Sequence, residues 1–166
     1  MKREEGINDR HWDSVEEAGE LLNEGSYTEA LAELQRVLET DKDNPYAYFF
    51  LGVACYELDH KEAARDAYEA CLRLAPAYLG AKVALTHVYR ELGDTKKALQ
   101  KGISALSQHP DDSDALYAVG MAYLSRGEKD PARKYFEAFL LAKPEFEAAT
   151  EVNGILASLN ESKGEA

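Results

Sequence analysis

The side chains that could carry out chemistry in this chain are four histidines, two cysteines and a short run of aspartates. The histidines are His11, His60, His87 and His109, and no two of them have the spacing of metal ligands within one helix or turn. The sequence also has no glycine-rich phosphate loop and no strand-turn-helix serine motif. We therefore expect no enzyme activity, no catalytic residue, no metal and no cofactor.

Two weaker candidates have structural explanations. Asp111, Asp112 and Asp114 resemble part of a calcium loop, but they fit better as a turn and a helix N-terminus, whose dipole favours acidic side chains. Cys55 and Cys71 occupy positions at which other copies of the repeat described below carry mostly apolar residues. We expect both thiols to be buried, with redox or metal chemistry as the alternative.

A repeat of 34 residues organises most of the chain. Residues of the same type recur at this interval without a slip. They are the prolines Pro76, Pro110 and Pro144, the glycines Gly25, Gly93 and Gly127, and the alanines Ala30, Ala64, Ala98 and Ala132. Asp59 occupies the position of the missing glycine. Such a period is typical of arrays in which each unit buries its apolar face against its neighbours.

Each period predicts one antiparallel pair of helices. Apolar residues recur at helical intervals over residues 45–58 and again over residues 62–74, with a short polar turn between them. The same layout returns in the following repeats. The pattern predicts nine helices, at about 11–24, 28–41, 45–58, 62–74, 79–92, 96–108, 113–126, 130–142 and 146–160.

At the repeated positions the chain resembles the tetratricopeptide repeat (TPR) family, whose pattern is an aromatic residue, Leu-Gly, Tyr, Ala, a second aromatic residue and Pro. The second copy matches best, with Tyr48, Leu51, Gly52, Ala64, Tyr68 and Pro76. The resemblance implies an all-α fold, a right-handed α-solenoid of four helix-turn-helix repeats followed by a C-terminal capping helix.

The expected domain organisation follows from this register. It comprises a polar N-terminal extension (1–10), four TPR repeats spanning 11–146 (11–44, 45–78, 79–112 and 113–146), a capping helix (147–160) and a disordered tail (161–166). The capping helix carries one apolar stripe, which should cover the edge of the fourth repeat. Its members are Ala148, Ala149, Val152, Ile155, Leu156 and Leu159.

The first helix of each pair carries a second stripe that packing within the pair does not need. In proteins that this chain resembles, that face lines a concave groove that binds a peptide. The candidate partner-binding residues are Trp12, Tyr46, Phe49, Val53, Tyr56, Val83, His87, Arg90, Tyr117, Met121 and Leu124. We expect Trp12, Tyr46, Tyr56 and Leu124 nearer the groove's edges. The alternative, strongest for inner members such as Phe49 and Tyr117, is that they pack against the neighbouring helix.

The net charge of −12 is concentrated in residues 11–44. Nucleic acid is not expected as a partner, because binding its backbone requires a basic stripe. The acidic first repeat is either a solvated face or a surface that selects a partner segment carrying Lys or Arg. No apolar run is long enough to span a bilayer or to act as a signal peptide. We therefore expect no membrane insertion and a soluble, cytoplasmic protein, unless a targeting segment precedes this sequence.

On these grounds we expect a protein–protein interaction scaffold or adaptor that binds an apolar or aromatic segment of a partner. The alternatives are a dedicated chaperone for an aggregation-prone client, similar to the class II chaperones of type III secretion, and a regulatory subunit of an enzyme. Self-association also stays open. Some members of the family that this chain resembles bind the terminal carboxylate of a chaperone through Lys, Asn and Arg side chains in the groove. The matching positions here are Val15, Gly19, Phe50, Gly80 and Ala84, so capture of an acidic chaperone tail is not expected.

Overall fold

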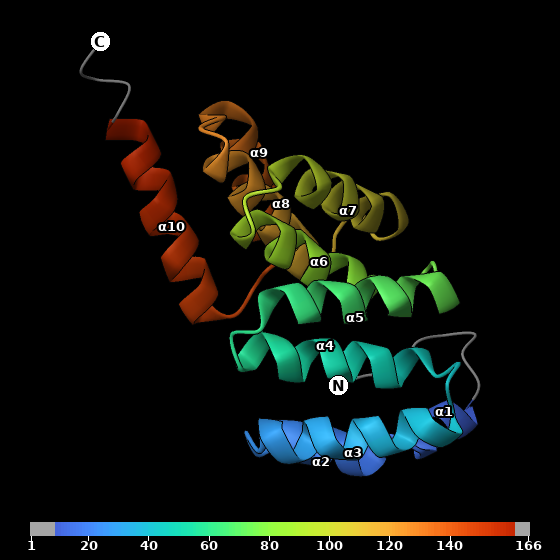
Figure 1. Ribbon diagram of the computed structural model, residues 1–166. Helices are drawn as coiled ribbons and strands as arrows, with labels where there is room; N and C mark the ends of the chain where they lie inside the picture. Colours follow the sequence, from blue (N-terminus) through green and yellow to red (C-terminus); the bar gives the residue numbers. More distant parts are fainter. Residues whose placement is uncertain (1–8, 162–166) are drawn as a thin grey trace. The chain divides into compact units, whose positions relative to one another are not determined.

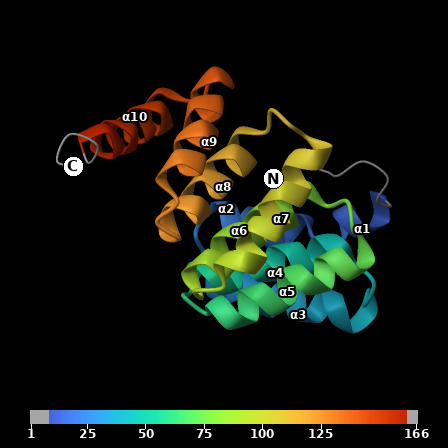
Figure 2. The same cartoon turned by 90° about the horizontal axis from the view of Figure 1, so that it is seen from above.

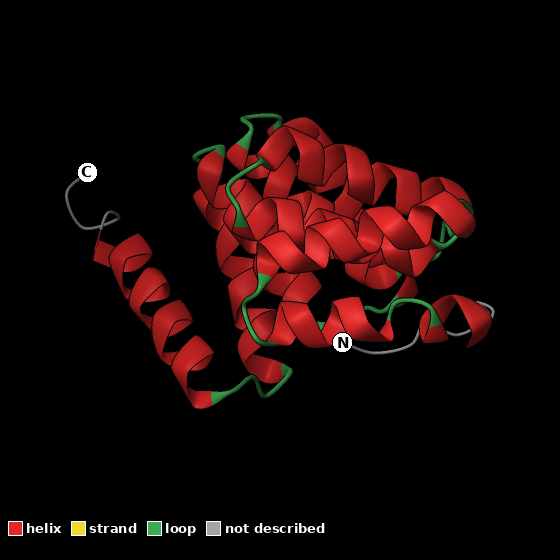
Figure 3. Ribbon diagram, turned by 60° about the horizontal axis from the view of Figure 1, so that its bottom comes forward, coloured by secondary structure: helices red, strands yellow, loops and turns green. Residues whose placement is uncertain are grey.

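The computed structural model describes residues 9–161, and all regular structure in this range is helical (Figure 3). The expected all-α fold class is confirmed. The chain divides into two compact units, Met1–Val88 and Tyr89–Ala166, and each is described by itself. Apart from residues 9, 10 and 161, which are helical, the expected N-terminal extension and C-terminal tail lie outside the described residues.

The first unit consists of α1 (Asp9–Asp13), α2 (Glu16–Asn23), α3 (Tyr27–Thr40), α4 (Pro45–Glu57), α5 (Lys61–Leu74) and most of α6 (Leu79–Glu91). Helix α3 packs against α2 and α4, and α4 packs against α5 (Figure 1). The core of the first unit is built from residues that recur at helical intervals. Among them are Ala18, Leu34 and Phe50, which are all almost completely buried.

The second unit contains the end of α6 and four complete helices, α7 (Thr95–Gln108), α8 (Ser113–Ser125), α9 (Lys129–Leu141) and α10 (Phe146–Glu161). Helix α8 contacts α7 and α9, and α9 contacts α10 (Figure 2). Val152 of α10 is buried in one cluster with Phe136 and Phe139 of α9, and Ile155 and Leu156 pack against that cluster. The apolar stripe of α10 therefore lies against the last helix pair, as its sequence pattern indicated.

The turn inside each helix pair has the same backbone conformation in all four repeats. Gly25, Gly93 and Gly127 have φ angles of +77°, +82° and +75°, and Asp59, at the same repeat position, has a φ of +60°. This left-handed region costs a residue with a side chain more than it costs glycine. The repeated glycine is thus explained by backbone geometry, and Asp59 is the strained exception.

Replacing Asp59 with glycine is expected to stabilise the first unit by about 1 kcal/mol, because glycine removes the left-handed strain. The change also removes an ion pair between Asp59 and Lys61, with 3.2 Å between Oδ1 and Nζ. That exposed pair contributes little. Urea denaturation provides the measurement. Asp59→Ala, which loses the same ion pair and keeps the strain, is the matched control, and equal stability of the two variants would contradict the explanation.

The prediction of one continuous helix over residues 11–24 is wrong, because the chain breaks between α1 and α2. The carbonyl oxygen of His11, which would accept the amide of Val15 in a continuous helix, accepts Asn44 Nδ2 instead, at 2.8 Å. The Val15 amide donates to the Trp12 carbonyl at 3.0 Å. The break between α1 and α2 therefore depends on Asn44, which lies 33 positions beyond His11 in the sequence.

Asn44 is completely buried, and its side-chain hydrogen bonds connect this junction to α4. Its Nδ2 also lies 2.9 Å from both Ser14 Oγ and Asp41 Oδ2, so its two hydrogens are shared among three acceptors. Its Oδ1 accepts the Ala47 amide at 3.1 Å and so caps the N-terminus of α4. One side chain thereby joins the end of α1 to the start of α4 and sets where Trp12 lies.

Candidate functional site

A cleft between α4 and α6 brings together three of the expected site residues, all within the first unit. It encloses about 330 Å³ and is termed here the α4–α6 cleft. Its lining consists of Val53, Tyr56 and Glu57 of α4, Tyr68 of α5, and Ala84, His87 and Val88 of α6. Val53, Tyr56 and His87 were expected from the stripe, whereas Glu57, Tyr68, Ala84 and Val88 were not.

The α4–α6 cleft combines an apolar floor with a polar rim. Val53 and Tyr56 are half-buried, Val88 is buried, and Glu57 is exposed at the edge. Tyr68 is only 3% exposed, and burial raises the pKa of its phenol, so the group stays neutral at physiological pH. Such a lining suits an apolar side chain with a few polar contacts at its margin.

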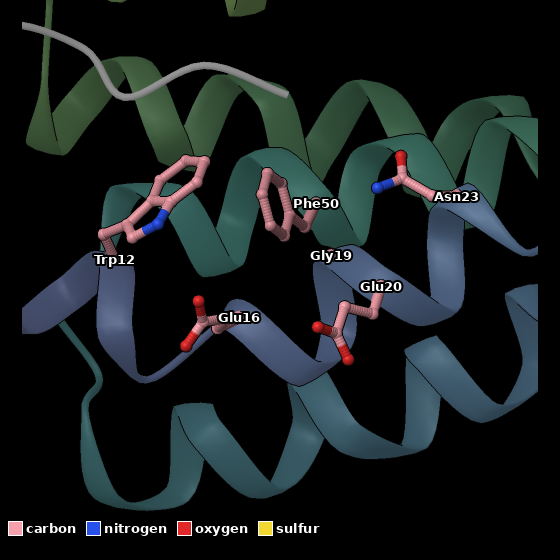
Figure 4. A pocket seen from close by; sticks show the side chains of 6 residues that line it. All are labelled: Trp12, Glu16, Gly19, Glu20, Asn23 and Phe50. Carbon is pink, nitrogen blue, oxygen red and sulfur yellow. The ribbon is translucent and has the colours of Figure 1, made fainter.

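A second, smaller cavity lies between α2 and α4 and encloses about 170 Å³ (Figure 4). It is termed here the α2–α4 pocket, and it is lined by Trp12, Glu16, Gly19, Glu20, Asn23 and Phe50. Trp12 meets Phe50 edge-on, with ring centroids 6.0 Å apart. A Cβ atom on Gly19 would approach Phe50 Cε2 to 3.1 Å, so the absence of a side chain at this position lets the Phe50 ring lie close to α2.

Two expected site residues of α4 are used mainly for packing. Tyr46 is 1% exposed, so its expected place at the groove's edge is wrong. Its ring lies between those of Trp12 and Tyr78, with centroid distances of 5.1 and 5.8 Å. Phe49 is half-buried and contacts the rings of Tyr68 and Tyr78 at 5.7 and 4.9 Å. Packing, the alternative considered for inner stripe positions, accounts for Phe49.

Val83 is half-buried and is not among the residues that line the two cavities. Arg90 belongs to the second unit, where its Nη2 lies 3.2 Å from Oε1 of its neighbour Glu91. The surroundings of these two residues do not indicate that either one binds a ligand. Both residues remain expectations of the stripe pattern.

In the second unit the stripe of α8 is largely occupied by neighbouring helices. The Tyr117 ring lies 5.8 Å from that of Phe139, and its hydroxyl donates to Glu151 Oε1 of α10 at 2.8 Å. Burial, with a contribution from this hydrogen bond, raises the pKa of Tyr117 to about 12. Met121 and Leu124 pack against the same cluster. These three residues therefore help to hold α9 and α10 in place against α8.

The residues that could have done chemistry have structural roles where the structure describes them. Cys55 and Cys71 are buried free thiols, and burial raises the pKa of Cys55, which disfavours the reactive thiolate. Asp112 caps α8 by accepting the Ala115 amide at 2.8 Å. Within residues 9–160, no three His, Cys, Asp or Glu side chains group closely enough to hold a metal ion. In the same part of the chain, no helix has the length and apolarity needed to cross a membrane.

The α2–α4 pocket was only partly visible in the sequence. Trp12 was among the expected residues, but Glu16, Glu20, Asn23 and Phe50 were not. The signal that could have found them is the spacing of Glu16 and Glu20, four apart beside a stripe position occupied by glycine. Residues at this spacing share a helix face, so the two carboxylates lie near one another.

Comparison with known proteins identifies the repeats. Two family models, both described as tetratricopeptide repeat, match residues 15–78 and 89–159. The chain is also 32% identical over 78 residues to superkiller complex protein 3 of Homo sapiens. That stretch covers 47% of this chain but 5% of the human protein, so the chain spans a small part of that relative's length.

Two crystal structures are similar to the chain in fold. MamA superposes with a TM-score of 0.73 at 28% identity, over 80% of this chain and 78% of that one. YrrB, described as a TPR protein with an unusual peptide-binding site, has a TM-score of 0.72 at 24% identity, over 89% of this chain and 76% of that one. Both are TPR solenoids, and scaffolds of this kind are typically not enzymes. This chain is a protein-interaction scaffold, and it belongs to the tetratricopeptide repeat family.

Proposed function

We propose that this protein is an adaptor that binds an apolar or aromatic segment of a partner protein in the α4–α6 cleft. The observation that carries the proposal is the open space between Val53 and Tyr56 on α4 and Ala84 and His87 on α6. Concave apolar sites with a few polar groups are the usual form of a ligand site.

The contrast within the stripe supports this location. Tyr46 is buried and Tyr117 is hydrogen-bonded to α10, whereas Val53, Tyr56 and His87 border open space. The similarity to YrrB, whose description includes a peptide-binding site, agrees with binding of a peptide segment. A partner of apolar character follows from the cleft's own lining, since Val53, Ala84 and Val88 offer no hydrogen-bonding side chain.

Replacing Tyr56 with alanine is expected to weaken partner binding by roughly 1–3 kcal/mol, the range for a large side chain at the centre of an interface. The partner segment is first located by cross-linking from a photoreactive residue placed at position 56 in the full chain. The mapped segment is then synthesised, and its affinity is measured by calorimetry. The same titration also tests whether the isolated segment is soluble, which distinguishes an adaptor's partner from a chaperone's client.

Glu62 provides the matched control, because it is exposed on α5 and does not line the cleft. A photoreactive residue at position 62 should not capture the segment, and Glu62→Ala should bind it with unchanged affinity. If the Tyr56→Ala variant binds the mapped segment as tightly as the original protein, the α4–α6 cleft is not the binding site.

A further inference from the structure

We propose that the α2–α4 pocket binds an arginine side chain of the partner segment. This inference names the chemistry of a second contact and rests on the proposed function, because it takes the ligand to be a protein segment. Three features of the pocket carry it: its acidic rim, its aromatic wall and the lack of a partner for its charges among the described residues.

The acidic rim consists of Glu16 and Glu20, which stand one helical turn apart on α2. Figure 4 shows the side chains of Glu16 and Glu20 in one row, with the rings of Trp12 and Phe50 and the amide of Asn23 in a second row beside it. Two like charges at this spacing repel one another. A cation placed between the rows would relieve that repulsion.

These carboxylates are not neutralised from within the described part of the chain. In residues 9–160, the carboxylates of Glu16 and Glu20 take part in no hydrogen bond or ion pair, and no Lys or Arg lines the pocket. Other acidic side chains of the same unit do have basic partners, for example Asp59 with Lys61 and Asp66 with Arg65. The rim therefore presents an uncompensated negative potential next to an opening.

The aromatic wall selects the shape of the cation. Trp12 is half-buried and borders the pocket, and the edge-on packing of Trp12 against Phe50 holds both rings in place. A planar guanidinium stacks on aromatic faces and can donate to two carboxylates at once, whereas an ammonium group is a compact, strongly hydrated charge. The pocket, which Gly19 also lines, has a volume of about 170 Å³, and such a group would lie in this space.

The chain carries its own reporter for a test, because Trp12 is its single tryptophan. The probes are two acetylated tripeptide amides, Leu-Arg-Leu and Leu-citrulline-Leu. Citrulline has nearly the shape of arginine without its charge. The arginine peptide is expected to change Trp12 fluorescence saturably, with an affinity that falls as salt is added, and the citrulline peptide to bind about tenfold more weakly.

The variant Glu16→Gln with Glu20→Gln is expected to bind the arginine peptide about five- to tenfold more weakly, as for two partly exposed ion pairs. The matched control is Glu29→Gln with Glu39→Gln, which removes the same charge from exposed positions of α3 that do not line the pocket. That control should stay within about twofold of the original affinity, because distant exposed charges are screened.

Three results would overturn the proposal. The first is equal binding of the arginine and citrulline peptides. The second is an equal loss of affinity in the two glutamine variants. The third is a large gain in affinity when Lys2 and Arg3 are both replaced by alanine in the full chain, since the pocket's occupant would then be the protein's own N-terminal segment. None of these results involves Tyr56, so the pocket can fail while the α4–α6 cleft holds, and the reverse.

Discussion

Gly52→Ala is expected to lower the free energy of unfolding by about 3 kcal/mol, at the upper end of the usual cost of overpacking a core. A Cβ atom at position 52 would lie 2.4 Å from Tyr68 Cε1 and 2.5 Å from Tyr68 Cδ1. Tyr68 cannot move away cheaply, because it is almost completely buried and its ring also contacts Phe49. Urea denaturation of the full chain measures the effect.

The chain offers a matched control and a compensating change. Gly154 lies in α10 with nothing within 4 Å of an added Cβ, so Gly154→Ala should stabilise the protein by about 1 kcal/mol through helix propensity. The first repeat has Ala18 and Leu34 at the positions of Gly52 and Tyr68. Combining Gly52→Ala with Tyr68→Leu should therefore cost at least about 1 kcal/mol less than the sum of the two single changes. Strict additivity would show that the two positions are not coupled.

Removing residues 146–166 is expected to make the protein associate in a concentration-dependent manner. Helix α10 buries Val152 against Phe136 and Phe139, and its loss would expose that apolar surface on α9. Repeat arrays need a terminal element with a polar outer face to stay soluble. Size-exclusion chromatography with light scattering at several protein concentrations provides the measurement. A truncated chain that stays monomeric at every concentration would contradict the capping role of α10.

A point substitution tests whether the buried apolar contact of α10, and not merely the presence of the helix, prevents association. Val152→Asp places a charge in a completely buried position and should cause the same association, with a loss of roughly 3 kcal/mol or more in stability. Asn153→Asp, one residue further along, adds the same charge at an exposed position and should change neither property. Similar behaviour of the two variants would mean that the packing of α10 does not matter for solubility.

Much of the fold could be predicted from the sequence because it depends on local and periodic signals. The recurring prolines and alanines set the register of the helix pairs, and apart from the first helix the observed helix ends differ from the expected ones by one residue at most. The turn glycines recur because the backbone there is left-handed, which is a local requirement. Position 59 shared this conformation although it holds aspartate.

The candidate site could be predicted only in part. A helical pattern shows which residues share a face, but it does not show what covers that face. Tyr46 and Tyr56 occupy the same face of α4, yet Tyr46 is buried between Trp12 and Tyr78 whereas Tyr56 borders the α4–α6 cleft. The difference is made by side chains that come from other helices.

What the sequence determined by itself was therefore the repeat, the helix pairs, their turns and the absence of a recognisable catalytic motif, because each of these follows from residue types at fixed short spacings. The tertiary structure decided the break before Val15, through the buried amide of Asn44, and the covering of Tyr117, through Glu151 of α10. It also decided that Glu16 and Glu20 line one pocket with Trp12 and Phe50. Those outcomes depend on contacts between residues far apart in the chain, and such contacts exist only after the helices have packed.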